Sequence, residues 1–178
     1  MDMKTLALLD DDRRGLLAAV DRVPEPDRGR RPAANQWSVA EILEHLASVE
    51  RAVAQLIATR GREPVPTGQQ PAVPLAGERV ARLRARERRI EVPDNLRPTG
   101  QQSAADAVAA LARSRTALLD AARAADPVAL EHRTYHHREL GRLALKDWLA
   151  FIAHHEARHA AQIDEIAAAL ERADPATL

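Results

Sequence analysis

Apolar residues recur along this chain at intervals of three and four, the spacing of a helix with one buried face. In the stretch 38–60, for example, Ile42, Val49 and Val53 share one face. The clearest boundary is Ser38-Val-Ala-Glu41, a capping box that satisfies free amide donors at a helix start. The pattern predicts four long helices, over about residues 3–22, 38–60, 103–125 and 143–173.

The connection between the second and third of these helices, residues 61–102, is unlike the others. Its first part is rich in proline and must be irregular, whereas residues 77–90 read as a short helix with Val80, Leu83 and Ile90 on one side. The connection is long enough to cross the length of a bundle, so the helices that it joins are expected to run parallel. With strand signals nearly missing, the predicted class is all-α, a four-helix bundle.

The composition limits the cellular location and the classes of binding partner that we expect for this protein. The 178 residues suffice for one domain, 1–178, and Lys plus Arg balance Asp plus Glu at 26 each, which leaves no net field to attract nucleic acid. Cysteine is absent, so a metal would need nitrogen or oxygen ligands. The apolar run Leu6–Leu9 is too short for a signal peptide or a membrane span. We expect a cytoplasmic protein with no membrane or nucleic-acid partner.

Three of the seven histidines occupy buried-face positions. His155 and His159 are one turn apart, about 40° around and about 6 Å along a helix, so both imidazoles can reach one ion. His45 falls on the apolar face of the second helix. Together His45, His155 and His159 suit a three-histidine metal site with open positions, although a buried histidine is often only a hydrogen-bonded core residue. His154 is expected to point sideways, and His132, His136 and His137 lie in an expected loop. These four are expected to be exposed or loop-packing residues, with lining the mouth of the site as the alternative.

Residues 155–159 also spell HExxH, the zinc-binding motif of many metalloproteases. A protease of that kind needs a further ligand, commonly downstream, and the 19 residues after His159 nearly all continue the same helix. The predicted fold also offers no edge strand to align a peptide. A metalloprotease is therefore disfavoured, and Glu156 is kept as a candidate acid/base, or as a partner that orients an imidazole.

Two segments carry a family resemblance. The Trp-Ser-x-x-Glu-x-x-x-His-Leu pattern at 37–46 and the His-x-x-x-His-x-x-Gln pattern at 155–162 resemble the DinB-like superfamily of metal-binding four-helix bundles. The resemblance implies up-down-down-up helix order, often a homodimer, and a metal triad at His45, His155 and His159. The ion that it implies is divalent, with zinc or nickel foremost and iron or manganese as alternatives.

Characterised relatives in that superfamily include S-transferases that use bacillithiol, mycothiol or glutathione. The resemblance thus implies transfer of a low-molecular-weight thiol to an electrophilic small molecule, because a bound cation lowers the pKa of a thiol. A metal-dependent hydrolase would use the same residues, and a non-catalytic, metal-stabilised stress-response module is a third reading. The arginines at 79, 82, 86 and 89 are expected either to form a solvated face or to form a cationic rim for an anionic thiol.

Overall fold

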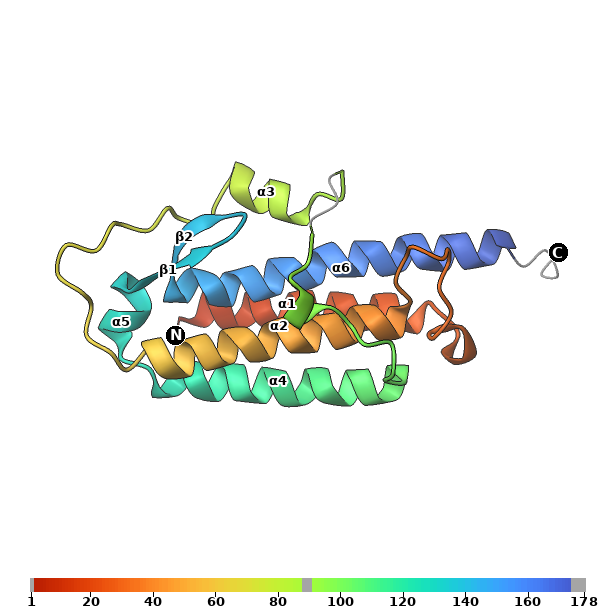
Figure 1. The fold of residues 1–178 in the computed structure, drawn as a ribbon, viewed down its shortest axis with the longest axis horizontal. Helices are drawn as coiled ribbons and strands as arrows, with labels where there is room; N and C mark the ends of the chain where they lie inside the picture. Colours follow the sequence, from red (N-terminus) through yellow and green to blue (C-terminus); the bar gives the residue numbers. More distant parts are fainter. Residues whose placement is uncertain (1, 88–90, 174–178) are drawn as a thin grey trace.

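The computed structural model describes residues 2–87 and 91–173, and most of them are helical. The long helices are α1 (Met3–Asp21), α2 (Val39–Arg60), α4 (Ala104–Ala124) and α6 (Leu145–Ala173). The short elements are η1 (Glu25–Asp27), α3 (Glu78–Arg84), η2 (Asp94–Leu96), α5 (Pro127–His132), β1 (Thr134–His137) and β2 (Gly141–Ala144). The four long helices form a bundle, which confirms the predicted helical class (Figure 1).

Helices α2 and α4 run in the same direction and pack most extensively against each other (Figure 1). Their C-terminal ends meet where the Asp126 amide donates to the Gly61 carbonyl at 2.8 Å. A Cβ at Gly61 would stand 2.7 Å from the Cβ of Ala125, so a residue with a side chain would force these ends apart. At the other end, the Thr99 amide donates to Glu44 of α2 just before α4 begins. The segment between the helices therefore returns along the bundle.

The helix starts follow the expected capping chemistry. Ser38 Oγ accepts from the Glu41 amide at 3.2 Å, and the Glu41 carboxylate accepts from the Ser38 amide at 2.9 Å, so both halves of the capping box form. Ser103 caps α4 by accepting from the Asp106 amide. These bonds satisfy amide donors that have no partner inside the helix, which is why local sequence located the boundaries well.

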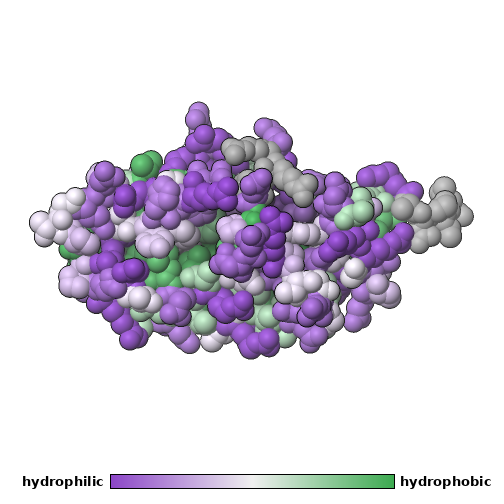
Figure 2. Space-filling view, viewed as in Figure 1, coloured by the Kyte–Doolittle hydropathy of each residue, from purple (hydrophilic) through white to green (hydrophobic). Residues whose placement is uncertain are grey.

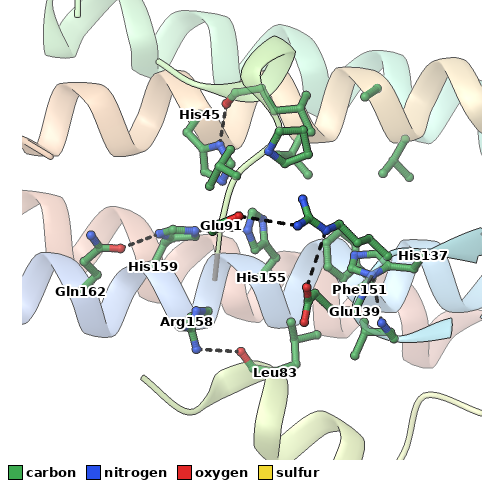
Figure 3. Close-up of a pocket in the computed structure, with 18 of the residues that line it drawn as sticks. His45, Leu83, Glu91, His137, Glu139, Phe151, His155, Arg158, His159 and Gln162 are labelled. Carbon is green, nitrogen blue, oxygen red and sulfur yellow. Dashed lines mark hydrogen bonds and ion pairs between the residues drawn. The ribbon is translucent and has the colours of Figure 1, made fainter. Parts of the chain in front are cut away.

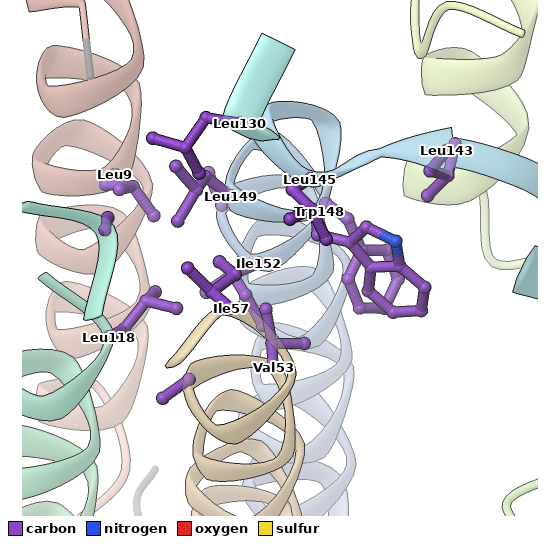
Figure 4. Packing of buried hydrophobic residues seen from close by; sticks show 14 of the residues in the cluster. Leu9, Val53, Ile57, Leu118, Leu130, Leu143, Leu145, Trp148, Leu149 and Ile152 are labelled. Carbon is purple, nitrogen blue, oxygen red and sulfur yellow. The ribbon is translucent and has the colours of Figure 1, made fainter. Parts of the chain in front are cut away.

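Among the described residues, the core consists of two apolar clusters at opposite ends of the bundle, separated by a layer of charge. Figure 4 shows part of the cluster nearer α5, which includes Leu9, Ile57, Leu118 and Ile152. The other cluster includes Leu16 of α1 and is built chiefly from leucine, isoleucine, valine and alanine. Each long helix contributes one charged residue to the layer between them: Arg13, Glu50, Arg115 and Glu156.

Residues 131–141 correct the expectation of a loop before the last helix, because His132 ends α5 and most of the residues after it belong to a hairpin. They contain β1 and the start of an antiparallel hairpin in which Thr134 pairs with Ala144 and His137 with Gly141. Gly141 has a φ of +68°, a conformation that glycine adopts readily, and so closes the turn. Strands of four residues are too short to show a clear alternation in sequence, and the hairpin depends on packing against α6.

The short crossover helix ends earlier than expected. It spans Glu78–Arg84, with Leu83 buried and Val80 packed against the core, whereas residues 88–90, including Ile90, lie outside the described residues. In the part of the chain that the structure describes, no helix is long and apolar enough to span a membrane.

Candidate metal centre

The bundle brings His45 of α2 together with His155 and His159 of α6. Their candidate ligand atoms all lie within 4.8 Å of one another, and the two Nε2 atoms of α6 are 3.1 Å apart. In Figure 3, His45 approaches from one helix and the other two imidazoles from the helix facing it. One turn of α6 sets the close pair, but only the packing of α2 beside α6 brings the third nitrogen within reach.

Hydrogen bonds orient two of the three rings. The Leu96 carbonyl, in η2 of the crossover, lies 2.8 Å from His45 Nδ1, and Gln162 Oε1 lies 2.9 Å from His159 Nδ1. A carbonyl oxygen can only accept, so each Nδ1 carries the proton and each Nε2 keeps its lone pair. This pairing of a ligand histidine with an outer acceptor is common in metal proteins. Leu96 could not be identified from sequence, because a main-chain acceptor leaves no residue signal.

Arg86 determines which end of the Gln162 amide faces His159. Its Nη1 donates to Gln162 Oε1 at 3.1 Å, and its Nε and Nη2 bind the Glu165 carboxylate at 2.7 and 2.8 Å. Because a guanidinium has only donors, the amide must present its oxygen here, and the same oxygen then accepts from His159. Arg86 thus sets the tautomer of His159 through Gln162.

We expect Gln162→Leu to weaken metal binding by about 10- to 100-fold, the usual effect of losing an outer hydrogen bond to a ligand. Gln162→Glu keeps an acceptor and should stay near wild type. Competition with a chromophoric chelator measures the affinities, and ¹⁵N NMR of metal-free protein reports the His159 tautomer. Equal affinity and an unchanged tautomer in Gln162→Leu would contradict this role.

Burial keeps the imidazoles of the cluster neutral. Desolvation lowers the pKa of His45, and desolvation with the neighbouring histidines lowers the pKa of His155 and His159 well below the usual range. A neutral imidazole is the form that binds a metal. Three neutral imidazoles converge, and two of them are held in the tautomer that leaves Nε2 free to bind a metal. The cluster therefore fits a divalent ion. Among the described residues, no fourth His, Asp or Glu joins the group, so ligand positions stay open.

A groove opens beside the cluster, between α2, α6, the crossover and the hairpin. In the view of Figure 2, a hydrophobic area lies in the half of the molecule that holds α5 and the hairpin, and hydrophilic residues surround it. Of the arginines expected at a cationic rim, those at 79, 82 and 86 line the groove. Arg79 binds the carbonyls of Val73, Pro74 and Leu140, and Arg86 binds Glu165, so these two also hold the crossover and hairpin in place. Arg89 lies outside the described residues.

Glu156 belongs to the charged layer of the bundle and not to the histidine cluster. Its carboxylate accepts from Arg13 at 2.6 Å and from Arg115 at 3.0 Å, and its side chain is 1% exposed. One residue along a helix is a rotation of about 100°, so Glu156 faces α1 and α4 while His155 faces α2. The structure thus places this carboxylate in ion pairs with two arginines, and the acid/base role suggested by the HExxH spacing stays a prediction.

The remaining histidines have distinct surroundings. His137 packs on Trp148 and Phe151 with ring centroids 5.2 and 4.7 Å away, and burial lowers its pKa to about 4. His154 is buried, and its Nδ1 accepts from Arg84 Nη2 at 2.9 Å. His132 and His136 are exposed. His137 and His136 line the groove, and the other two do not.

His154 gives a pH-dependent stability. Burial, with the nearby Arg84, lowers its pKa to about 4 in the folded protein, whereas the unfolded chain binds the proton near pH 6.5. Below pH 6.5 the unfolded state therefore holds more protons, and stability falls as the pH falls. The free energy of unfolding of metal-free protein should fall between pH 7.5 and pH 5.5, and we expect that fall to be smaller by about 1 kcal/mol in His154→Gln than in wild type. Urea unfolding measures it, with exposed His132→Gln as control, and an identical fall in His154→Gln would contradict the assignment.

The fold and the cluster define a helical bundle with a candidate three-histidine metal centre. The chain matches the model of the DinB superfamily over residues 8–163, and it belongs to that superfamily. It is 25% identical over 145 residues to the uncharacterized protein YuaE of Bacillus subtilis (strain 168), covering 81% of this chain and 85% of YuaE. The crystal structure of TT2238, a four-helix bundle protein, superposes with a TM-score of 0.57 at 22% identity, covering 91% of this chain and 97% of that one. This last likeness concerns the fold alone.

Proposed function

We propose that this protein binds a divalent metal, zinc or nickel, at His45, His155 and His159 and transfers a low-molecular-weight thiol to an electrophilic small molecule. The observation that carries the proposal is the convergence of three neutral imidazoles on an open groove. Membership of the DinB superfamily supports it, because that family resemblance implies both the triad and the thiol chemistry.

A divalent cation at these imidazoles supplies positive charge that lowers the pKa of a thiol beside it. The chain itself keeps the three imidazoles neutral by burying them, and Leu96 and Gln162 orient two of them. The walls of the groove surround the reacting groups. In the transfer, the thiol gives its proton to solvent, and its sulfur forms a bond to an electrophilic carbon. With a halide substrate, the carbon–halogen bond breaks and the halide leaves with the electron pair.

The transfer reading is preferred to hydrolysis because of where Glu156 lies. Two arginines engage this carboxylate within the charged layer, so it is not positioned to take a proton from water beside the cluster. We also propose that the protein is a homodimer, which sedimentation equilibrium would test.

The test uses untagged protein loaded with zinc or nickel. Bacillithiol, mycothiol and glutathione are each offered with 1-chloro-2,4-dinitrobenzene and, separately, with iodoacetamide, and thioether formation is followed by absorbance or mass spectrometry. We expect turnover above the uncatalysed rate with at least one thiol, lost in His155→Ala and retained in His132→Ala. A metal-loaded protein that accelerates none of these reactions would favour the non-catalytic, metal-stabilised module.

A further inference from the structure

Aromatic residues are scarce in this chain and concentrated in one place. The 178 residues include two Trp, one Tyr and one Phe, and all four line the groove beside the histidine cluster. The rest of the buried core is made chiefly of leucine, isoleucine, valine and alanine. A core that needs aromatic volume only for packing would not be expected to place every ring at the edge of one groove.

Three of these rings and one imidazole form a continuous surface, here named the aromatic wall: Tyr135, His137, Trp148 and Phe151. Within the wall, the ring centroids of Trp148 lie 6.2 Å from Tyr135, 5.2 Å from His137 and 5.7 Å from Phe151. These are tilted or edge-to-face contacts within the usual range for aromatic pairs. The hairpin supplies two members and α6 supplies the other two, so the wall exists only when the hairpin lies against the helix.

The aromatic wall leads directly to the histidine cluster. Phe151 stacks on His155 with the ring centroids 5.2 Å apart and the planes at 18° (Figure 3). A planar group resting on the wall would therefore lie beside one of the three imidazoles. On the opposite side of the cluster, Trp37 contacts His45 with a centroid separation of 5.1 Å.

Two members of the wall have unused binding capacity. Tyr135 is 44% exposed, one of few large hydrophobic side chains that open to solvent in the described part of the chain. The indole N–H of Trp148 is the one buried side-chain polar group among the described residues without a hydrogen-bond partner. An unpaired buried donor is costly. Tyr135 therefore offers a ring face to a ligand in the groove, whereas the Trp148 N–H is enclosed by the protein.

We propose that the aromatic wall is the subsite for a planar aromatic group of the electrophilic substrate. This inference rests on the proposed function, and it assigns the class of acceptor that the groove takes. Electron-rich faces of Tyr135 and Trp148 favour an electron-poor ring, such as a nitro-substituted or carbonyl-substituted arene, because opposite ring polarities attract. The arene lies next to His155, and the thiol reaches it from the side of the three imidazoles.

The test measures binding without chemistry. Metal-free protein, with no thiol present, is titrated with nitrobenzene and with nitrocyclohexane, which has the same polar group on a saturated, non-planar ring. Two-dimensional NMR follows the amide signals. We expect nitrobenzene to bind about 3- to 10-fold more tightly than nitrocyclohexane, which is the amount that aromatic contacts of this kind contribute to affinity. The largest shifts of amide signals are expected at residues 135–137 and 148–151.

Variants locate the effect. Tyr135→Ser and Phe151→Leu should each weaken nitrobenzene binding by about 3- to 10-fold without changing that of nitrocyclohexane. Val128→Ser removes an exposed apolar side chain from α5, outside the groove, and serves as the control. Circular dichroism checks that each variant is folded. Equal affinity for the two ligands, or no effect of both wall variants, would overturn the proposal.

The subsite and the proposed function can fail separately. Selective nitrobenzene binding with no thiol transfer would leave the subsite standing and overturn the transferase. Thiol transfer to iodoacetamide as fast as to 1-chloro-2,4-dinitrobenzene, with no preference for nitrobenzene, would keep the transferase and overturn the subsite.

Discussion

Replacing His155 by alanine should abolish stoichiometric metal binding. In wild type, Nε2 of His155 lies 3.1 Å from that of His159 and close to His45, so its loss leaves two donors where three converge. A structural zinc site contributes about 10–16 kcal/mol over its ligands, so one ligand accounts for about 3 kcal/mol or more, a hundredfold or greater change in affinity. His45→Ala should have the same effect from the other helix.

Plasma mass spectrometry of untagged protein, after zinc or nickel is offered and excess is removed, measures the bound metal. His136→Ala, which removes an exposed histidine of the groove, is the control and should keep full occupancy. Because the ion would join α2 to α6, a chelator should also lower the melting temperature of wild type but not of His155→Ala. Metal absent from wild type, or retained in both triad variants, would reduce the three histidines to packing residues.

Removing the Glu156 carboxylate should be the most destabilising change away from the cluster. Arg13 and Arg115 both donate to it, and each of these arginine side chains is less than 15% exposed. Glu156→Ala leaves two buried guanidinium groups with only Glu50 as a charged partner. Breaking a buried ion pair in this way costs about 3–5 kcal/mol, because the remaining charge stays desolvated.

Urea unfolding of metal-free protein measures that loss. Asp164→Ala, which removes the partner of Arg22 in an exposed ion pair, is the matched control and should cost less than about 1 kcal/mol. Glu156→Gln should retain bound metal, since the carboxylate does not serve the histidine cluster. A loss in Glu156→Ala no larger than in the control, or loss of metal in Glu156→Gln, would contradict the ion-pair role.

Local sequence predicted the helices because their boundaries are governed by local chemistry. The Ser38 capping box and the Asp126-Pro127 stop act within a few residues, and the period of apolar positions identified the buried faces. The same period placed His45 and His155 inward. The chain is a helical bundle of the DinB superfamily, as these patterns and motifs indicated.

The charged layer was missed although the chain carries a signal for it. Arg13 falls between Leu9 and Leu16 on the buried stripe of α1, and Arg115 lies between Leu111 and Leu118 of α4. A charge at such a position indicates an internal partner, since a lone buried charge is prohibitively costly. Sequence does not identify the carboxylate partner: the HExxH motif associated Glu156 with the histidines, whereas the structure places its carboxylate against Arg13 and Arg115.

Sequence by itself determined the helical class, the approximate boundaries of the four long helices and their inward faces, because these depend on interactions within a few residues. Only the tertiary structure decided the partners: that Leu96 orients His45, that Arg86 sets His159 through Gln162, and that the hairpin builds an aromatic wall. The contact between Leu96 and His45 joins residues 51 positions apart through a main-chain carbonyl, which leaves no residue signal. The aromatic wall depends on a hairpin whose strands are too short to show an alternating pattern. Their geometry arises when the helices pack, and no local pattern records it.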